Sequence, residues 1–372
     1  MPQISELIEE TNRMQKELYS KYSFRVSLKQ FKEAMDDNAA TIENIQQTFP
    51  IKPNYVVRNA EKSASEDTSK DFESLEEIER YIEQQGKQIE IKGKESSGFT
   101  LIISPGVFLP LKISVEIPDY SEANIFELFT GPASTIALQR IDLGKESKAE
   151  INILQAQGPK SKLALTNTGI VSENSELAIN SLFAGGSFTK ADNLFEAIGK
   201  GGVLKASTVI AGNSNQAFDI SNTLINSAPE TVVSSKSATV VEDSAVCFMK
   251  DFAKVAKEAS GSVSHVEERG IIADSARFVP LPDMSVDTRQ VKDASHSASS
   301  EPLNAKDIFY MSARGVPLEK AKSMLMLGLP IRYLNDIKSA KIKEVMISLL
   351  KSKILYNSVR PEKIDTFGIW TA

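Results

Sequence analysis

The spacing of hydrophobic and polar residues changes twice along this chain. Up to about residue 50 the apolar residues recur at helical spacing, and residues 59–71 are mainly charged and polar, which indicates an exposed linker. From Gln88 to Val286 apolar and polar residues alternate, as in AEINIL, SKLALTN and VLKASTVI. After Pro302 the helical spacing returns. The pattern therefore predicts an N-terminal helical region, a long β core and a C-terminal helical domain, over residues 1–87, 88–290 and 291–372.

The central strands are predicted to stack as a solenoid. Their centres lie about 12–15 residues apart without an intervening helix, and this regular spacing indicates an all-β array. The Asn-Gly and Asp-Gly turns that favour hairpins are absent from the sequence. Small aliphatic residues occupy the inward positions, which suits a narrow interior. We therefore expect a mainly β fold, a right-handed parallel β-helix flanked by helical regions, with an ordinary double sheet as the alternative.

Three helices are predicted after Pro302. In LNAKDIFYMSARG, Asn304 suits the N-cap and Gly315 suits the C-terminal stop. The next helix opens with Pro317 in its first turn and is expected to end at Gly328. The third helix has lysines on one face and an apolar stripe on the other, formed by Ile342, Val345, Met346, Leu349 and Leu350.

Composition narrows the possible partners and compartments. The 43 basic and 49 acidic residues give a net charge of −6, which argues against nucleic acid as the main partner. The most apolar stretch, from Gly98, is interrupted by Pro105, Pro110 and Lys112, so no membrane span is expected. Cys247 is the single cysteine, and the N-terminus lacks the pattern of a secretory signal. We expect a cytoplasmic protein.

Two glycine-rich segments, AGGSF and GKGGV, do not have the spacing of a phosphate-binding loop. They are predicted to be turns. Any ATP hydrolysis linked to this chain is therefore expected to belong to a partner.

The segment from Gly270 to Gly328 resembles the C-terminal signature of the SufB/SufD family of iron–sulfur cluster assembly proteins. Two blocks carry the resemblance, Asp293-Ala294-Ser295-His296-Ser297-Ala298-Ser299 and Phe309-Tyr310-Met311-Ser312-Ala313-Arg314-Gly315-Val316. The order of helices, β-helix and helices also agrees with that family.

The resemblance implies a non-catalytic scaffold without a stably bound cofactor. Such subunits pair through the β-helix, as homodimers or heterodimers with another SufB/SufD-type subunit, and bind a SufC-like ABC ATPase through the C-terminal helical domain. A transient iron–sulfur cluster at the subunit interface is implied as cargo. The implied ATPase-binding residues are Ile308, Phe309, Tyr310, Arg314, Gly315 and Val316.

The chain departs from the family pattern at several positions. Ala294 stands where many members have Cys, and Ala273 stands near a scaffold Cys of SufB-type chains. Ser297 and Asn226 also replace residues that recur in the family. Because clusters are held chiefly by several thiolates, one Cys cannot hold a cluster alone. The resemblance is therefore closer to the SufD type than to the SufB type.

Three residues are candidates for ligand chemistry. His296 is a candidate interface ligand, with a structural loop histidine as the alternative. Cys247 is either a thiolate ligand or a buried small hydrophobic residue. His265, beside Glu267 and Glu268, is either a metal ligand or a surface histidine in a salt bridge.

Two other functions remain open at this point. A β-helix enzyme acting on polysaccharide would need outward acids, and Asp219 and Lys205 lie on predicted strands without a repeated acidic cluster. A purely structural paralogue that does not ligate iron is the second alternative.

Overall fold

The computed structural model describes residues 55–57, 80–84, 86–92, 99–103, 108–131 and 134–357. The predicted N-terminal helices and the linker 59–71 lie outside these ranges. Residues 80–84, part of the short helix expected before Gly86, are helical.

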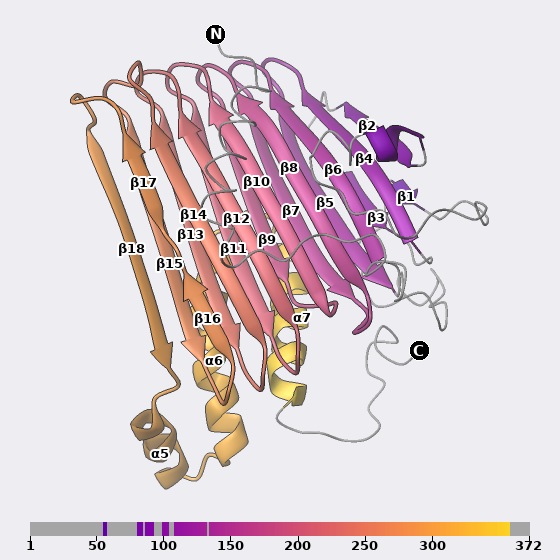
Figure 1. Cartoon of the computed structure of the whole chain (residues 1–372), viewed down its shortest axis with the longest axis vertical. Helices are drawn as coiled ribbons and strands as arrows, with labels where there is room; N and C mark the ends of the chain where they lie inside the picture. The colour runs from indigo at the N-terminus through magenta and orange to yellow at the C-terminus, as the bar shows by residue number, and fades with distance from the viewer. Residues whose placement is uncertain are drawn as a thin grey trace.

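The strands form two sheets in which every strand pairing is parallel (Figure 1). Sheet one contains, in spatial order, β1 (Tyr55–Val57), β3 (Phe99–Ile103), β5 (Glu122–Gly131), β7 (Lys148–Gln157), β9 (Glu176–Phe183), β11 (Val203–Gly212), β13 (Val232–Val241), β15 (Val263–Ile272) and β18 (Asp293–Pro302). Sheet two contains β2 (Lys87–Lys92), β4 (Phe108–Ile117), β6 (Ser134–Leu143), β8 (Lys162–Val171), β10 (Phe188–Ala197), β12 (Ala217–Asn226), β14 (Val246–Val255), β16 (Arg277–Pro280) and β17 (Asp283–Val286).

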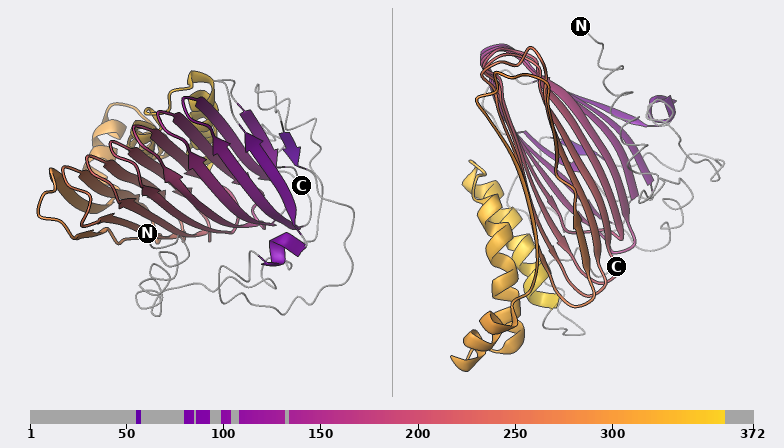
Figure 2. Two further views of the ribbon diagram at one scale, coloured as in Figure 1. Left: turned by 90° about the horizontal axis from the view of Figure 1, so that it is seen from above. Right: turned by 60° about the vertical axis from the view of Figure 1, so that its left-hand side comes forward.

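From β1 to β16 consecutive strands alternate between the two sheets, so each pair of strands forms one rung stacked on the previous rung. Asn193, for example, lies in register with Asn167 on the rung before and with Asn222 on the rung after, 26 and 29 residues away. The left panel of Figure 2 shows the two layers stacked rung upon rung. The predicted parallel solenoid is confirmed, and the alternative of hairpin-linked sheets is wrong.

The hydrophobic core lies between the two sheets because every second residue of each strand points inward. Ile151 and Ile179, in register on β7 and β9, are 0% and 2% exposed. Burial of an aliphatic side chain of this size contributes about 1.5–3 kcal/mol, so the stacked inward columns stabilise the solenoid. Gly270 on β15 leaves space for the ring of Phe278, which a side chain at that position would overlap.

Three helices follow the solenoid, α5 (Ala305–Ala313), α6 (Leu318–Leu334) and α7 (Ala340–Asn357). Helices α6 and α7 pack on the outer face of sheet one (Figure 2, right panel). The predicted apolar stripe of α7 is buried there. The contact includes Met326, Leu334 and Met346 of the helices and Leu154, Leu182 and Val209 of the sheet.

Two expected boundaries differ from the structure. Strand β18 begins after residue 290, so the serine-rich segment assigned to the helical domain extends sheet one by a further strand. Helix α6 does not end at Gly328 but continues through Pro330 to Leu334. Its later turns are held in place because Pro330, Tyr333 and Leu334 are buried.

Candidate functional site

The first candidate surface is the open end of the solenoid, which we define as strand β18 with the last strands of sheet two, β16 and β17. Strand β18 pairs with β15 along one edge only, and none of its residues is buried. Among the described residues no strand pairs with its other edge. A free edge of this kind offers backbone donors and acceptors to an additional strand.

The candidate ligand His296 lies on β18 and is exposed. His296 lies in register with Val266, an inward residue of β15 that is 2% exposed. The side chain of His296 therefore occupies an inward position, and it is exposed because no further strand in the described part of the chain is stacked on β18. The structure therefore places His296 on a strand, not in the loop that the sequence suggested.

Cys247 is not brought to the same surface as His296. It lies on β14 in sheet two, is 0% exposed, and its Sγ is 3.9 Å from Oγ1 of Thr239. Burial raises the pKa of the Cys247 thiol far above its usual range. A neutral, enclosed thiol is a weak nucleophile and a poor metal ligand, so Cys247 has the properties of a core residue.

His265 makes its contacts with β18. Its Nδ1 is 2.8 Å from Oγ of Ser295, and its Nε2 is 3.7 Å from Oδ2 of Asp293. Of the two glutamates that follow it in sequence, Glu267 pairs with Arg269 and Glu268 points into the interior. Within the described ranges, no group of three or more His, Cys, Asp or Glu is arranged to hold a metal ion.

The sequence analysis missed a file of buried amides inside the solenoid. Asn167 Nδ2 donates to Asn193 Oδ1 at 2.7 Å, Asn193 Nδ2 donates to Asn222 Oδ1 at 2.6 Å, and Asn222 Nδ2 donates to Asp251 Oδ1 at 2.7 Å. The file therefore ends on a carboxyl group near the open end. Its members are 26 to 29 residues apart, a period that could have revealed them once a solenoid repeat was assumed.

The second candidate surface is the α5 face, which we define as Phe309 and Tyr310 of α5 with Leu318 and Met324 of α6. These side chains are 74%, 56%, 59% and 47% exposed. The guanidinium of Arg314 lies 4.4 Å from the ring centre of Tyr310, a cation–π contact. Large exposed apolar side chains with an arginine are typical of protein interfaces.

Helix α5 has the predicted cap at its start, and the remaining residues predicted to bind an ATPase, Ile308, Gly315 and Val316, lie on the helix or just after it. Asn304 caps the helix, with its Oδ1 accepting the backbone N–H of Lys306 at 2.9 Å. Gly315 follows the helix with a φ of +86°, a conformation that favours glycine. Ile308 and Val316 are half-buried. The predicted block is thus a single short helix and its C-terminal turn.

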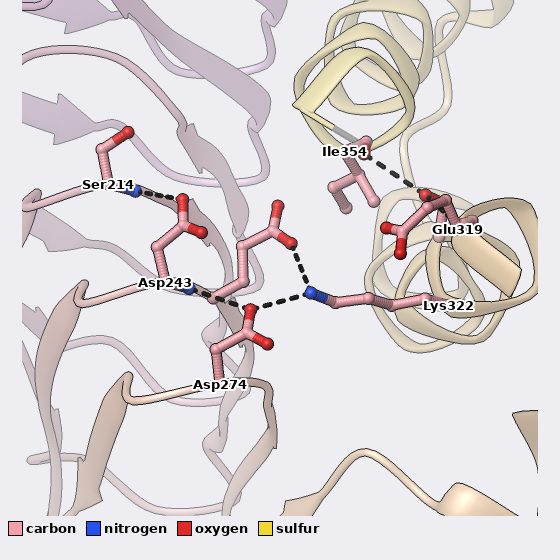
Figure 3. Close-up of polar contacts among 8 residues, drawn as sticks. Ser214, Asp243, Asp274, Glu319, Lys322 and Ile354 are labelled. Atoms are coloured by element: carbon pink, nitrogen blue, oxygen red, sulfur yellow. Dashed lines mark hydrogen bonds and ion pairs between the residues drawn. The ribbon is translucent and has the colours of Figure 1, made fainter. Parts of the chain in front are cut away.

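The α5 face is joined to the solenoid through α6. Lys322 of α6 contacts the solenoid turns, with its Nζ 2.8 Å from Oδ2 of Asp274 (Figure 3). Lys353 of α7 reaches another turn, where its Nζ is 2.6 Å from Oδ1 of Asn213 and 2.7 Å from Oε1 of Gln216. These polar contacts supplement the apolar packing that holds α6 and α7 on the solenoid.

The features expected for a sugar-cleaving site are not assembled at the predicted positions. Asp219 is 3% exposed, and its Oδ2 is 3.3 Å from Nζ of Lys190. Lys205 lies on the other sheet and pairs with Glu176 at 3.0 Å. In the part of the chain that the structure describes, no helix has the length and apolar character needed to cross a membrane.

Comparison with known proteins assigns the chain to a family. Residues 104–329 match the family model described as "SUF system FeS cluster assembly, SufBD core domain". The chain belongs to the SufB/SufD family of the SUF iron–sulfur cluster assembly system.

A curated relative is the iron–sulfur cluster assembly protein SufD of Bacillus subtilis (strain 168). It is 23% identical to this chain over 167 residues, which are 45% of this chain and 38% of the relative. The match therefore covers less than half the length of that relative.

Proposed function

We propose that this chain is a non-catalytic scaffold subunit of an iron–sulfur cluster assembly complex and binds a SufC-like ABC ATPase through the α5 face. The single observation that supports this docking is the exposure of Phe309 and Tyr310, 74% and 56%, beside an arginine. Isolated exposed aromatics occur on many surfaces, but four large exposed apolar side chains on two consecutive helices suit a partner. The family membership of the chain supports an ATPase as that partner.

The open end is proposed to pair with a second SufB/SufD-type subunit, either a second copy of this chain or a sister subunit. The free edge of β18 supplies backbone groups for a strand of the partner. Its outward side chains, Ser295, Ser297 and Ser299, are small, so a partner backbone can approach closely.

A cluster assembled at this interface would be cargo of the complex. This chain would offer His296, because its thiol is enclosed in the core. Thiolate ligands would therefore come from the partner subunit, as the chemistry of iron–sulfur clusters requires.

Copurification of the full-length chain with a SufC-like ATPase tests the docking proposal. Phe309→Ala combined with Tyr310→Ala should weaken binding at least tenfold, because interface aromatics commonly contribute about 1–3 kcal/mol each. Tyr120→Ala is the matched control, since Tyr120 is also 74% exposed but lies in a turn of the solenoid. No binding by the wild-type chain, or equal binding by the double variant, would refute the proposal.

A further inference from the structure

The amide file inside the solenoid ends on a carboxyl group that accepts three hydrogen bonds. Asp251 Oδ1 accepts from Asn222 Nδ2 at 2.7 Å. Its Oδ2 accepts from the hydroxyl groups of Ser235 at 2.9 Å and Ser237 at 2.8 Å. Burial raises the pKa of Asp251 from 3.8 to about 6, although the donors on its two oxygens lower it, so Asp251 is mainly ionised at neutral pH.

A second carboxyl group faces the same space. Glu268 on β15 is 0% exposed, and its Oε1 accepts the backbone N–H of Asp251 at 2.8 Å. Its Oε2 is buried and has no hydrogen-bond partner among the described residues. Burying an ionised carboxylate with one unpaired oxygen costs much more free energy than burying the same group as a neutral carboxylic acid.

Among the described residues, no lysine or arginine lies among the inward side chains that surround Glu268. The inward residues of β13 and β16 next to it are Ser235, Ser237 and Phe278. The other ionisable inward groups are Asp251 and Cys247 on β14 and His296 on β18. Burial raises the pKa of Glu268, and the nearby Asp251 charge raises it further. One proton is therefore held on Glu268 at neutral pH.

Strand β18 covers this acid. Ala298 lies in register with Glu268 and is the next residue along the inward column. Because β18 has one pairing edge and no buried residue, few apolar contacts oppose its separation from β15. The buried acid is therefore the direct neighbour of a strand that has no buried residue.

We propose that β18 is a proton-linked cover: when β18 separates from β15, Glu268 meets water and transfers its proton to the solvent. No bond other than the O–H bond of Glu268 breaks in this step, and the proton passes to water or buffer. The proposal does not depend on the ATPase or on a second subunit. It predicts that any partner that binds the separated form of β18 does so with proton release.

The sign of the pH dependence follows from the direction of proton transfer. An exposed glutamic acid has a pKa of about 4.3, so above that pH the separated form is stabilised by ionisation while the covered form keeps its proton. Opening should increase as pH rises, by up to tenfold per pH unit.

Hydrogen exchange of the full-length chain, followed by mass spectrometry of peptides from β15 and β18, measures this opening. After correction for the intrinsic pH dependence of exchange, wild-type opening should rise roughly 10- to 100-fold between about pH 6 and about pH 8. Glu268→Gln keeps the shape and removes the titration, so its opening should be independent of pH. Glu127→Gln, a buried glutamate on β5, is the matched control and should behave as wild type.

Opening that does not change with pH in the wild type, or a pH dependence that persists in Glu268→Gln, would overturn the proposal. An infrared difference spectrum gives an independent measurement if Glu268→Gln does not fold. Wild-type protein with carboxyl-labelled glutamate should then show a protonated carboxyl band at about pH 8, where an exposed glutamate is ionised. Absence of a band from any protonated glutamate at that pH would equally refute the proposal.

Discussion

Lys322 of α6 lies with its Nζ 2.8 Å from Oδ2 of Asp274 and 3.3 Å from Oε2 of Glu242. These two carboxylates belong to consecutive turns on one side of the solenoid. Asp274 Oδ2 also accepts the backbone N–H of Asp243 at 3.3 Å, so the same oxygen links two turns and a helix (Figure 3). Lys322 therefore fixes the position of α6, and with it the position of the α5 face.

Lys322→Met should loosen this junction. The Lys322 side chain is 19% exposed and that of Glu242 is 8% exposed, so the charges are partly shielded from water. We expect a loss of about 1–3 kcal/mol in the free energy of unfolding, measured by urea denaturation. Lys320→Met, at an exposed position of the same helix, is the control and should change stability by less than about 0.5 kcal/mol. Equal stability of the two variants would contradict this account of the junction.

Asn193→Ala should destabilise the solenoid from its interior. Asn193 is 4% exposed, accepts from Asn167 and donates to Asn222, so its removal leaves a buried donor and a buried acceptor without those partners. The expected cost is about 2–5 kcal/mol, read from the urea midpoint. Thr166→Ala, at a half-buried outward position on β8, should cost much less. A midpoint for Asn193→Ala as high as that of this control would argue against a structural role for the amide file.

Glu127 should make stability depend on pH. It is 0% exposed, and burial raises its pKa from 4.5 to about 7, although a hydrogen bond from Gln139 acts in the other direction. The folded state thus keeps a proton that the unfolded chain releases above pH 4.5. The stability that protonated Glu127 contributes to the folded state is fully present below pH 4.5. It is lost as pH rises to about 7, at up to about 1.4 kcal/mol per pH unit.

Denaturation of the wild type and of Glu127→Gln at about pH 5 and about pH 8 measures this effect. The difference between the two proteins isolates Glu127, because Glu268 is present in both and its contribution cancels. The variant should gain stability relative to the wild type at the higher pH. A constant difference across this range would show that Glu127 does not titrate there.

Cys247 should be unreactive in the folded protein. Its thiol is 0% exposed and its pKa is raised by burial, so both access and thiolate formation are suppressed. A chromogenic disulfide reagent should react at least about a hundredfold more slowly with the native chain than with the chain unfolded in urea at the same pH. Rapid reaction of native protein would instead support a role for Cys247 as a ligand.

The period-two pattern sufficed to predict the strands and their stacking, because inward columns such as Ile151 and Ile179 repeat in every rung. Strand β18 was not predicted, since its segment has no alternation of apolar residues. The edge of β15 provides the template that makes this segment a strand, and that is a tertiary effect.

The candidate surfaces were predicted in part. Phe309, Tyr310 and Arg314 could be assigned to one helix from local sequence, and they do lie together. Asp251 and Glu268 are 17 residues apart and lie on different sheets, so their contact depends on the register between rungs. Local patterns do not contain that register, and for this reason the interior carboxyl pair was missed.

The rung repeat restricts how the length of this protein can change. In-register residues on successive rungs are 26 and 29 residues apart, so the turns accommodate small differences in length. An insertion of one residue within a strand would shift inward residues outward, whereas a whole added turn, such as the 29 residues that separate Asn193 from Asn222, keeps the columns in register. Each added turn would lengthen the stack by one strand spacing, about 4.8 Å. Homologues that differ by whole turns should therefore hold their two ends at discrete separations, and a partner that spans both ends could distinguish them by length alone.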